Sequence, residues 1–213
     1  MNTRRILSLG LILMVLSNCA VMSEEECAYS DWTAVGYEDG ADGRSSDRFG
    51  DYRRACADFG ITPDFTAWQN GRDRGLVEYC QPQRGFQVGQ SGGSYNGVCT
   101  AQLEPGFLDG YRLGSELFVL RNNLNTINTR LEANSNDAAE IDADVAEIES
   151  IIILEDTTAE ERTVLLADMR ELSEIRGELE VEYELLIEER AFADAALAEF
   201  ELTLIGTEFS LRP

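Results

Sequence analysis

Apolar residues in the second half of the chain recur at alternating steps of four and three, the spacing of helices that pack through one face. Polar stretches at residues 134–136 and 155–157 divide this pattern into three runs. The runs are Leu113, Leu117, Leu120, Leu124, Ile127 and Leu131; then Ala138, Ile141, Val145, Ile148 and Ile152; then Leu165, Met169, Leu172, Ile175, Leu179, Tyr183, Leu186, Ala193, Leu197 and Phe200. Because short connections favour antiparallel neighbours, the pattern predicts three helices in an up-down-up arm with coiled-coil packing.

Two polar pairs mark where the later helices of this arm are expected to begin. Asp137 with Glu140, and Thr158 with Glu161, have the spacing of capping residues at a helix N-terminus. The third predicted helix is much the longest, so part of its apolar face has no partner within the chain. That surplus predicts self-association of the arm through a coiled coil.

The segment before the arm repeats an aromatic residue followed by two glycines that are four residues apart. The copies are Trp32 with Gly36 and Gly40, Trp68 with Gly71 and Gly75, and Phe107 with Gly110 and Gly114. Four-residue spacing places both glycines of a copy on one face of a helix. The three helices are expected to begin at Ser23, with Glu26 completing a capping box, at Pro63 and at Pro105. A further helix is expected over residues 47–59, ended by Gly60.

Glycine inside a helix costs about 1 kcal/mol relative to alanine, so six of them require a compensating interaction. Close approach of two helix backbones supplies one, with aromatic rings packed beside the glycines. We expect such packing. The functional alternative is a ligand-binding groove lined by Trp32, Tyr37, Trp68 and Tyr111.

Two glycine-containing stretches lack the residue pattern of a ligand-binding loop. Residues 81–99 lack the lysine and the strand–loop–helix context of a phosphate-binding loop, so they predict a long surface loop. Residues 38–43 superficially resemble a calcium loop but lack its alternating acids and final glutamate. Neither stretch predicts a cofactor or a metal site.

The N-terminus has the features of an export signal over residues 1–18. Arg4 and Arg5 precede an apolar run, residues 6–16, that is too short to span a bilayer. The run ends in a sequence that resembles a bacterial lipobox, in which Cys19 becomes the lipid-carrying first residue of the mature chain; Asn18 departs from the small residue usual there. Ordinary signal cleavage or an uncleaved anchor are the alternatives. Ala20, where an aspartate would retain a lipoprotein in the inner membrane, favours an outer-membrane anchor facing the periplasm.

Four further cysteines, Cys27, Cys56, Cys80 and Cys99, lie in the glycine-rich segment. An even number in an exported chain predicts two disulfides, and the absence of a C-x-x-C pair disfavours a zinc site. Three pairings are possible, and short-range closure favours Cys27–Cys56 with Cys80–Cys99.

The composition excludes several classes of chemistry. The chain has no histidine and no lysine, so it cannot build a histidine-dependent catalytic triad or a Schiff-base lysine by itself. Its 40 acids against 17 basic residues give a net charge of -23, which argues against nucleic acid as a partner. We predict no catalytic residue, no cofactor and no small-molecule substrate.

The order of cysteine, glycine and aromatic residues resembles the domain-of-unknown-function 2799 family of small Gram-negative lipoproteins. Besides the lipobox, the resemblance is carried by Cys27, Trp32, Gly36, Asp39, Gly40, Gly43, Cys56, Gly60, Trp68, Gly71, Gly75, Leu76, Tyr79, Cys80, Gly85, Gly89, Tyr95, Gly97, Cys99, Phe107, Gly110, Tyr111 and Gly114. It covers residues 27–114 and implies an envelope lipoprotein without implying an activity, since the family has no assigned reaction.

These patterns predict an all-α protein of three parts: a signal peptide over residues 1–18, a disulfide-stapled, glycine-rich helical head over 19–112, and an acidic antiparallel helical or coiled-coil arm over 113–213. The expected role is a structural or protein-interaction module, lipid-anchored in the cell envelope, that forms a homo-oligomer or binds an envelope protein. An acidic inhibitor of basic cell-wall hydrolases is the alternative.

Overall fold

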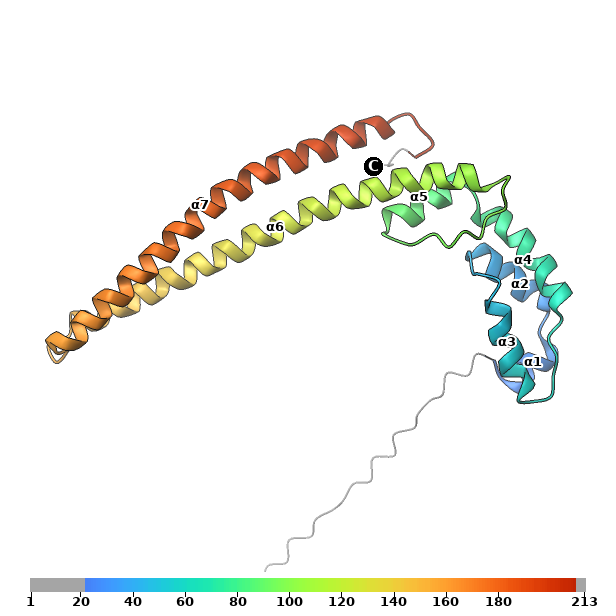
Figure 1. Cartoon of the computed structure of the whole chain (residues 1–213), viewed down its shortest axis with the longest axis horizontal. Helices are drawn as coiled ribbons and strands as arrows, with labels where there is room; N and C mark the ends of the chain where they lie inside the picture. The colour runs from blue at the N-terminus through green and yellow to red at the C-terminus, as the bar shows by residue number, and fades with distance from the viewer. Residues whose placement is uncertain (1–21, 210–213) are drawn as a thin grey trace, which may run out of the picture. The chain divides into compact units, whose positions relative to one another are not determined.

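The computed structural model describes residues 22–209, and every regular element in that range is a helix (Figure 1). The helices are α1 (Glu24–Tyr29), α2 (Trp32–Ala41), α3 (Arg48–Ala57), α4 (Phe65–Tyr79), α5 (Pro82–Gln90), α6 (Glu104–Ile152) and α7 (Ala159–Leu204). The predicted all-α class is therefore confirmed. The predicted signal peptide and the lipidation residue Cys19 lie outside the described residues.

The chain divides into two compact units, Met1–Glu78 and Tyr79–Pro213. The division falls near the end of α4, whereas the expected boundary between residues 112 and 113 falls inside α6. A single helix thus continues from the glycine-rich segment into the arm, and the two units are described separately below.

The first unit is built around an aromatic core held by a disulfide. Cys27 of α1 is bonded to Cys56 of α3, as the short-range pairing predicts. Trp32, Phe49 and Trp68 are buried together, with ring centroids 5.1 Å apart for Phe49 and Trp68 and 6.4 Å apart for Trp32 and Phe49. Large buried rings of this kind compensate for the small size of the unit.

The helix boundaries of this unit follow local signals. Ser23 and Glu26 form the predicted capping box, but it caps only the short α1. The glycine helix expected to begin there is α2, which begins at Trp32 because the Asp31 side chain caps it by accepting from two backbone N–H groups. Gly60, at φ 71°, ends the turn that follows α3, a conformation that glycine adopts without strain. The expected start at Pro63 is wrong by two residues. Helix α4 begins at Phe65, because the Asp64 side chain accepts a hydrogen bond from the Ala67 N–H and caps the helix there.

The second unit begins with a helix that the sequence interpretation missed. Residues 82–90, expected to be part of a surface loop, form α5. Pro82 occupies the first helical position, and Gly85 and Gly89 share the four-residue glycine spacing of the other helices. The remaining residues to Cys99 are non-helical, and Cys99 is bonded to Cys80, as predicted.

Both units contain the same arrangement of two parallel helices in backbone contact, which we call the glycine pair. In the first unit, a Cβ added to Gly36 would lie 1.9 Å from the Trp68 carbonyl oxygen, and one added to Gly71 would lie 2.0 Å from that of Thr33. In the second unit, the corresponding distances are 2.1 Å from Gly85 to the Phe107 oxygen and 2.0 Å from Gly110 to the Pro82 oxygen. Real Cβ atoms do not approach oxygen so closely, so these positions admit only glycine.

The glycine pairs also share their position relative to the disulfides. Cys27 and Cys56 precede the first glycines of α2 and α4 by 9 and 15 residues. Cys80 precedes Gly85 of α5 by 5 residues, and Cys99 precedes Gly110 of α6 by 11 residues. The difference of six residues is the same in both units, so each unit contains one copy of a repeated cysteine–helix–cysteine–helix module.

Helix α6 is one continuous helix of 49 residues, so the predicted break at 134–136 is wrong. Asn134 lies three residues after Leu131 and four before Ala138, so it continues the apolar spacing instead of interrupting it. It is buried, and its Nδ2 donates a hydrogen bond of 3.0 Å to the Leu179 carbonyl oxygen of α7. Asp137 is therefore an interior helix residue and not a cap.

Helices α6 and α7 run antiparallel as a hairpin, in place of the three-helix up-down-up arm (Figure 1). Ion pairs cross between them from Arg121 to Glu201 at 2.9 Å and from Arg176 to Asp142 at 3.2 Å. Arg176 occupies the seam position that was expected for Ile175, which is exposed. The break at 155–157 and the capping box at the start of α7 are confirmed.

Candidate functional site

The four residues of the hypothetical groove are not gathered in one place within either unit. Trp32 and Trp68 are buried in the core of the first unit, so neither is available to line an open groove. Tyr37 is 41% exposed on α2. Tyr111 belongs to the second unit, where its hydroxyl donates to the Gly93 carbonyl oxygen at 3.1 Å. The glycine contacts support the packing interpretation of the repeat.

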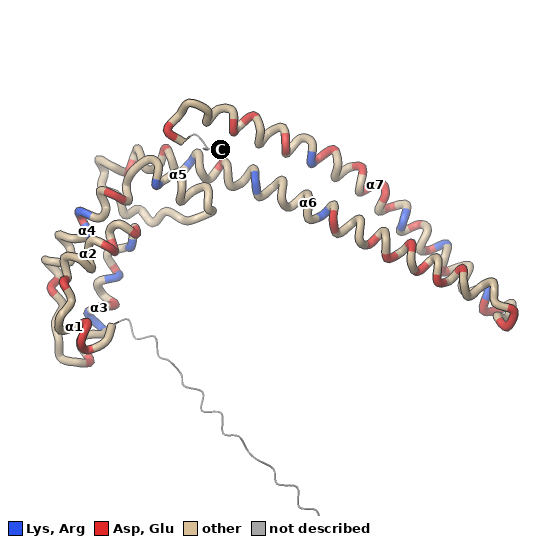
Figure 2. Tube along the Cα trace, turned by 180° about the vertical axis from the view of Figure 1, so that it is seen from behind, with Lys and Arg blue, Asp and Glu red and all other residues tan. Residues whose placement is uncertain are grey.

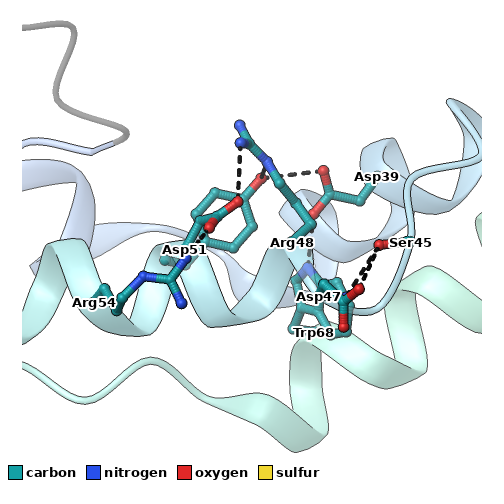
Figure 3. Close-up of polar contacts among 8 residues, drawn as sticks. Asp39, Ser45, Asp47, Arg48, Asp51, Arg54 and Trp68 are labelled. Carbon is teal, nitrogen blue, oxygen red and sulfur yellow. Dashed lines mark hydrogen bonds and ion pairs between the residues drawn. The ribbon is translucent and has the colours of Figure 1, made fainter.

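A buried carboxylate in the first unit joins three helices (Figure 3). Asp39 of α2 accepts a 2.8 Å hydrogen bond from Trp68 Nε1 of α4 and a 3.1 Å hydrogen bond from the Tyr52 hydroxyl of α3. Arg48 Nε in turn donates to the Tyr52 oxygen at 3.2 Å. Buried charges require such partners, so this cluster fixes the three helices relative to one another.

The environment of this cluster changes the titration of Tyr52. Burial raises the pKa of the Tyr52 hydroxyl, although the hydrogen bond from Arg48 opposes that change. The pKa of Arg48 is also raised, chiefly by its hydrogen bond to Tyr52. Tyr52 therefore remains a neutral donor to Asp39. Both carboxylate oxygens of Asp39 have donors, which leaves the cluster a structural role.

The second unit has an equivalent aromatic cluster around Phe107. Tyr79 stacks on this ring at a centroid distance of 5.1 Å, and Tyr95 lies tilted beside it at 4.7 Å. The Tyr95 hydroxyl donates to Glu104 at 2.9 Å and accepts from the Cys99 N–H at 3.1 Å. Burial is the main cause of its raised pKa. The cluster thereby connects the loop before Cys99 to the start of α6.

The hairpin is rich in acidic residues, which Figure 2 shows along both helices and in the connection between them. From Glu116 onward the chain has 25 acids and 7 arginines, a net charge of -18. Several of those arginines form cross-helix ion pairs, for example Arg130 with Glu182 at 3.1 Å and with Glu189 at 3.4 Å. Most of the acids are left to define the field around the hairpin.

The hairpin tip, which we define as residues 151–166, combines this charge with exposed apolar side chains. Ile151, Leu154, Val164 and Leu165 line an open pocket of about 600 Å³. Asp156, Thr157, Glu160 and Glu161 complete its lining. This is the feature of the hairpin that most resembles a binding surface, because large exposed apolar groups rimmed by polar residues mark interaction sites.

The sequence does contain signals for the three features that were not predicted, which are the buried Asp39, the buried Asn134 and the hairpin tip. Asp39 stands between the two glycines of α2, a position that faces the neighbouring helix. Asn134 keeps the phase of the apolar seam, and the apolar run at 151–154 lies where two helices must turn. Each signal depends on the position of a residue within a pattern and not on its type.

Residues 22–209 contain no group of three or more histidine, cysteine, aspartate or glutamate side chains that could hold a metal ion. Of the helices in the same range, none has the length and apolar character needed to cross a bilayer.

Comparison with known proteins gives one match. No curated protein and no solved structure shows significant similarity to the chain. A family model described as a protein of unknown function, DUF2799, matches residues 31–116, which include both glycine pairs. The expected resemblance to this family is confirmed over residues 31–116, and most of the hairpin lies beyond the matched segment.

Proposed function

We propose that the protein is an envelope lipoprotein that acts as an interaction module, with its acidic hairpin presented to a basic protein partner. The observation that supports this most directly is the charge of the hairpin. It carries a net charge of -18 over paired helices whose apolar seam is covered within the chain. A field of this sign attracts basic surfaces and accelerates their association.

The dimensions of the hairpin suit a spacer. Helix α6 has 49 residues and would extend roughly 74 Å at 1.5 Å per residue. Helix α7 returns along it, and Leu204 at its end packs against Phe86 and Leu117. A helical hairpin of this length would hold a binding surface at its tip far from the start of α6.

Self-association is less favoured by the two-helix hairpin than by the predicted three-helix arm. That hypothesis rested on a third helix whose apolar face had no partner in the same chain. In the hairpin, Leu186 and Ala193 of α7 are buried against Ile127 and Leu131 of α6, and Leu204 is buried against Leu117. Two residues predicted for the α7 seam, Ile175 and Tyr183, are instead exposed. We therefore propose a basic envelope protein as the partner in preference to a second copy.

The tether in this proposal is a lipid on Cys19. Mass spectrometry of the mature protein purified from membranes tests it directly. We expect an N-terminal Cys19 bearing acyl chains, and a Cys19→Ser variant that loses membrane association. An unmodified N-terminus would contradict the tether without bearing on the hairpin.

The partner is tested by crosslinking the membrane-attached full chain in cells and identifying the adducts by mass spectrometry. We expect basic envelope proteins whose capture falls when salt is raised, because screening shortens the range of exposed charges from about 8 Å at 0.15 M to about 3 Å at 1 M. Capture that is independent of salt, or limited to copies of the same chain, would contradict the proposal.

An inhibitor of basic cell-wall hydrolases is the second candidate, favoured by the same acidic surface. It differs in requiring that the bound enzyme lose activity. Titrating a cationic lysozyme with the protein distinguishes the two: binding with loss of cell-wall hydrolysis supports an inhibitor, and binding with unchanged hydrolysis supports an interaction module.

A further inference from the structure

We infer that the hairpin tip is a docking site for a cationic amphipathic helix of the partner. This inference rests on the proposed function and extends it by naming the contact surface and the chemistry it recognises. Three properties of the tip carry it: exposed apolar side chains, a loop that is already ordered, and a rim of one charge.

The apolar component is large for so acidic a surface. Ile153 and Leu154 are 80% and 51% exposed, and Val164 and Leu166 are exposed beside them on α7. Ile151, Leu154, Val164 and Leu165 line the pocket of about 600 Å³. A hollow of this kind takes the apolar face of a helix, with side chains spaced at i, i+3, i+4 and i+7.

The loop between α6 and α7 is held by hydrogen bonds. Arg162 donates to the Leu154 carbonyl oxygen at 2.8 Å and to that of Thr157 at 3.2 Å. The Thr157 hydroxyl donates to the Ile151 carbonyl oxygen at 2.7 Å, which ties the start of α7 to the end of α6. The apolar side chains are therefore positioned before a partner arrives, and binding needs little further ordering.

The rim determines which partner fits. Asp156, Glu160 and Glu161 border the pocket, and Glu155 adjoins it in the loop. Arg162 is the single basic residue of the tip, and its guanidinium is engaged by the loop carbonyls. A second copy would bring the same acids into contact, and an anionic membrane surface would be repelled. A helix with lysine or arginine beside an apolar face satisfies both the pocket and the rim.

The test measures peptide binding to the full chain in zwitterionic nanodiscs, with binding to empty nanodiscs subtracted. The probe is a fluorescein-labelled 18-residue helical peptide with leucines on one face and lysines on the other. Two matched peptides replace either the leucines with serine or the lysines with glutamate. The protein variant is Ile153→Ser/Leu154→Ser. Its control is Val181→Ser, which removes a side chain that is 61% exposed in the middle of α7.

We expect the leucine–lysine peptide to bind most tightly and the tip variant to weaken it about tenfold or more, because the side chains at the centre of an interface dominate affinity. Val181→Ser is expected to bind as the unmodified protein does. Since the side chains of Ile153, Leu154 and Val181 are all exposed, both variants are expected to melt at the temperature of the unmodified protein.

The outcomes separate the inference from the proposed function. If both lysine peptides bind but the tip variant binds them equally well, the tip inference is overturned and the acidic hairpin remains the binding surface. If neither lysine peptide binds, the proposed function fails as well. Equal binding of the glutamate peptide would contradict the charge argument. A dimer in sedimentation that the tip variant abolishes would assign the tip to a second copy and also overturn the inference.

Discussion

The glycine pairs and the α6–α7 hairpin show two different ways to pack helices within one chain. In the glycine pairs, backbone meets backbone, and the missing side chains set the distance between helices. In the hairpin, buried side chains such as Leu117, Leu131 and Leu186 fill the space between the helices. The first arrangement tolerates no added atom. The second can be repacked, because its side chains have alternative rotamers and its helices can shift.

The largest expected effect comes from adding one methyl group to a glycine pair. In Gly36→Ala the new Cβ would lie 1.9 Å from the Trp68 carbonyl oxygen, which belongs to a helix backbone and cannot move aside alone. We expect a loss of about 3 kcal/mol in the free energy of unfolding of the first unit. Both tryptophans of the chain are in this unit, so urea unfolding followed by tryptophan fluorescence measures it selectively.

The matched control is Gly50→Ala in α3 of the same unit. Its new Cβ would meet only the end of the Arg54 side chain, at 3.4 Å. Because alanine is the better helix former, this variant is expected to be as stable as the unmodified protein or up to about 1 kcal/mol more stable. A Gly36→Ala protein that unfolds at the same urea concentration as Gly50→Ala would refute backbone contact between α2 and α4.

Reduction of the disulfides is expected to have an effect of similar size on each module. The bonds close loops of 29 and 19 residues, and each contributes about 3 kcal/mol on the chain-entropy model. The hairpin from residue 113 onward contains no cysteine. We therefore expect reductant to lower the melting temperature reported by tryptophan fluorescence while most of the helical circular dichroism signal remains.

The sequence was sufficient wherever a pattern was local. The capping boxes at α1 and α7 and three of the four glycine helices follow from residues within a few turns of one another. The disulfide pairing follows from closure between neighbouring cysteines in the sequence. The predictions were wrong where the type of a residue was given more weight than its position in the helical repeat. Residues 82–90 have the composition of a loop but the proline and glycine positions of a helix, and Asn134 is a polar residue at a seam position.

The candidate site could be predicted less well than the fold. The tip depends on how two helices end and on which side chains the loop leaves exposed, which heptad spacing does not specify. The aromatic residues expected to form a groove proved, for Trp32 and Trp68, to be core residues. An aromatic ring one turn from a glycine pair has the same sequence signature whether it lines a groove or fills a core.

Asn134→Leu tests how the hairpin seam differs from the glycine pairs. Leucine continues the apolar seam and removes a buried amide whose acceptor, the Leu179 carbonyl oxygen, lies in a helix. We expect the hairpin to gain about 1 kcal/mol in stability and to lose part of the specificity of its register, the known cost and benefit of a single seam asparagine. Thermal unfolding by circular dichroism measures the gain, with the exposed Asn136→Leu as control. A loss of stability would mean that the cross-helix hydrogen bond contributes more than apolar packing.

The smallest expected effect concerns two capping boxes, one at the start of α1 and one at the start of α7. The backbone N–H of Ser23, and then its hydroxyl, lower the pKa of Glu26 below the ordinary 4.5, and the same groups of Thr158 lower the pKa of Glu161. Because the folded-state pKa is the lower one, each carboxylate stabilises its helix above pH 4.5, and this contribution is lost as the pH falls through the lowered value.

Glu161→Gln and Glu26→Gln keep a side-chain acceptor but remove the titration. We therefore expect each variant to lose less melting temperature than the unmodified protein between pH 6 and pH 3. The difference should be larger for Glu161, at the start of a 46-residue helix, than for Glu26, because the Cys27–Cys56 disulfide holds α1 in place whether or not its cap is charged. Equal differences under oxidising conditions would show that the disulfide does not substitute for the cap, and reduction of the Cys27–Cys56 bond should then leave the Glu26 difference unchanged.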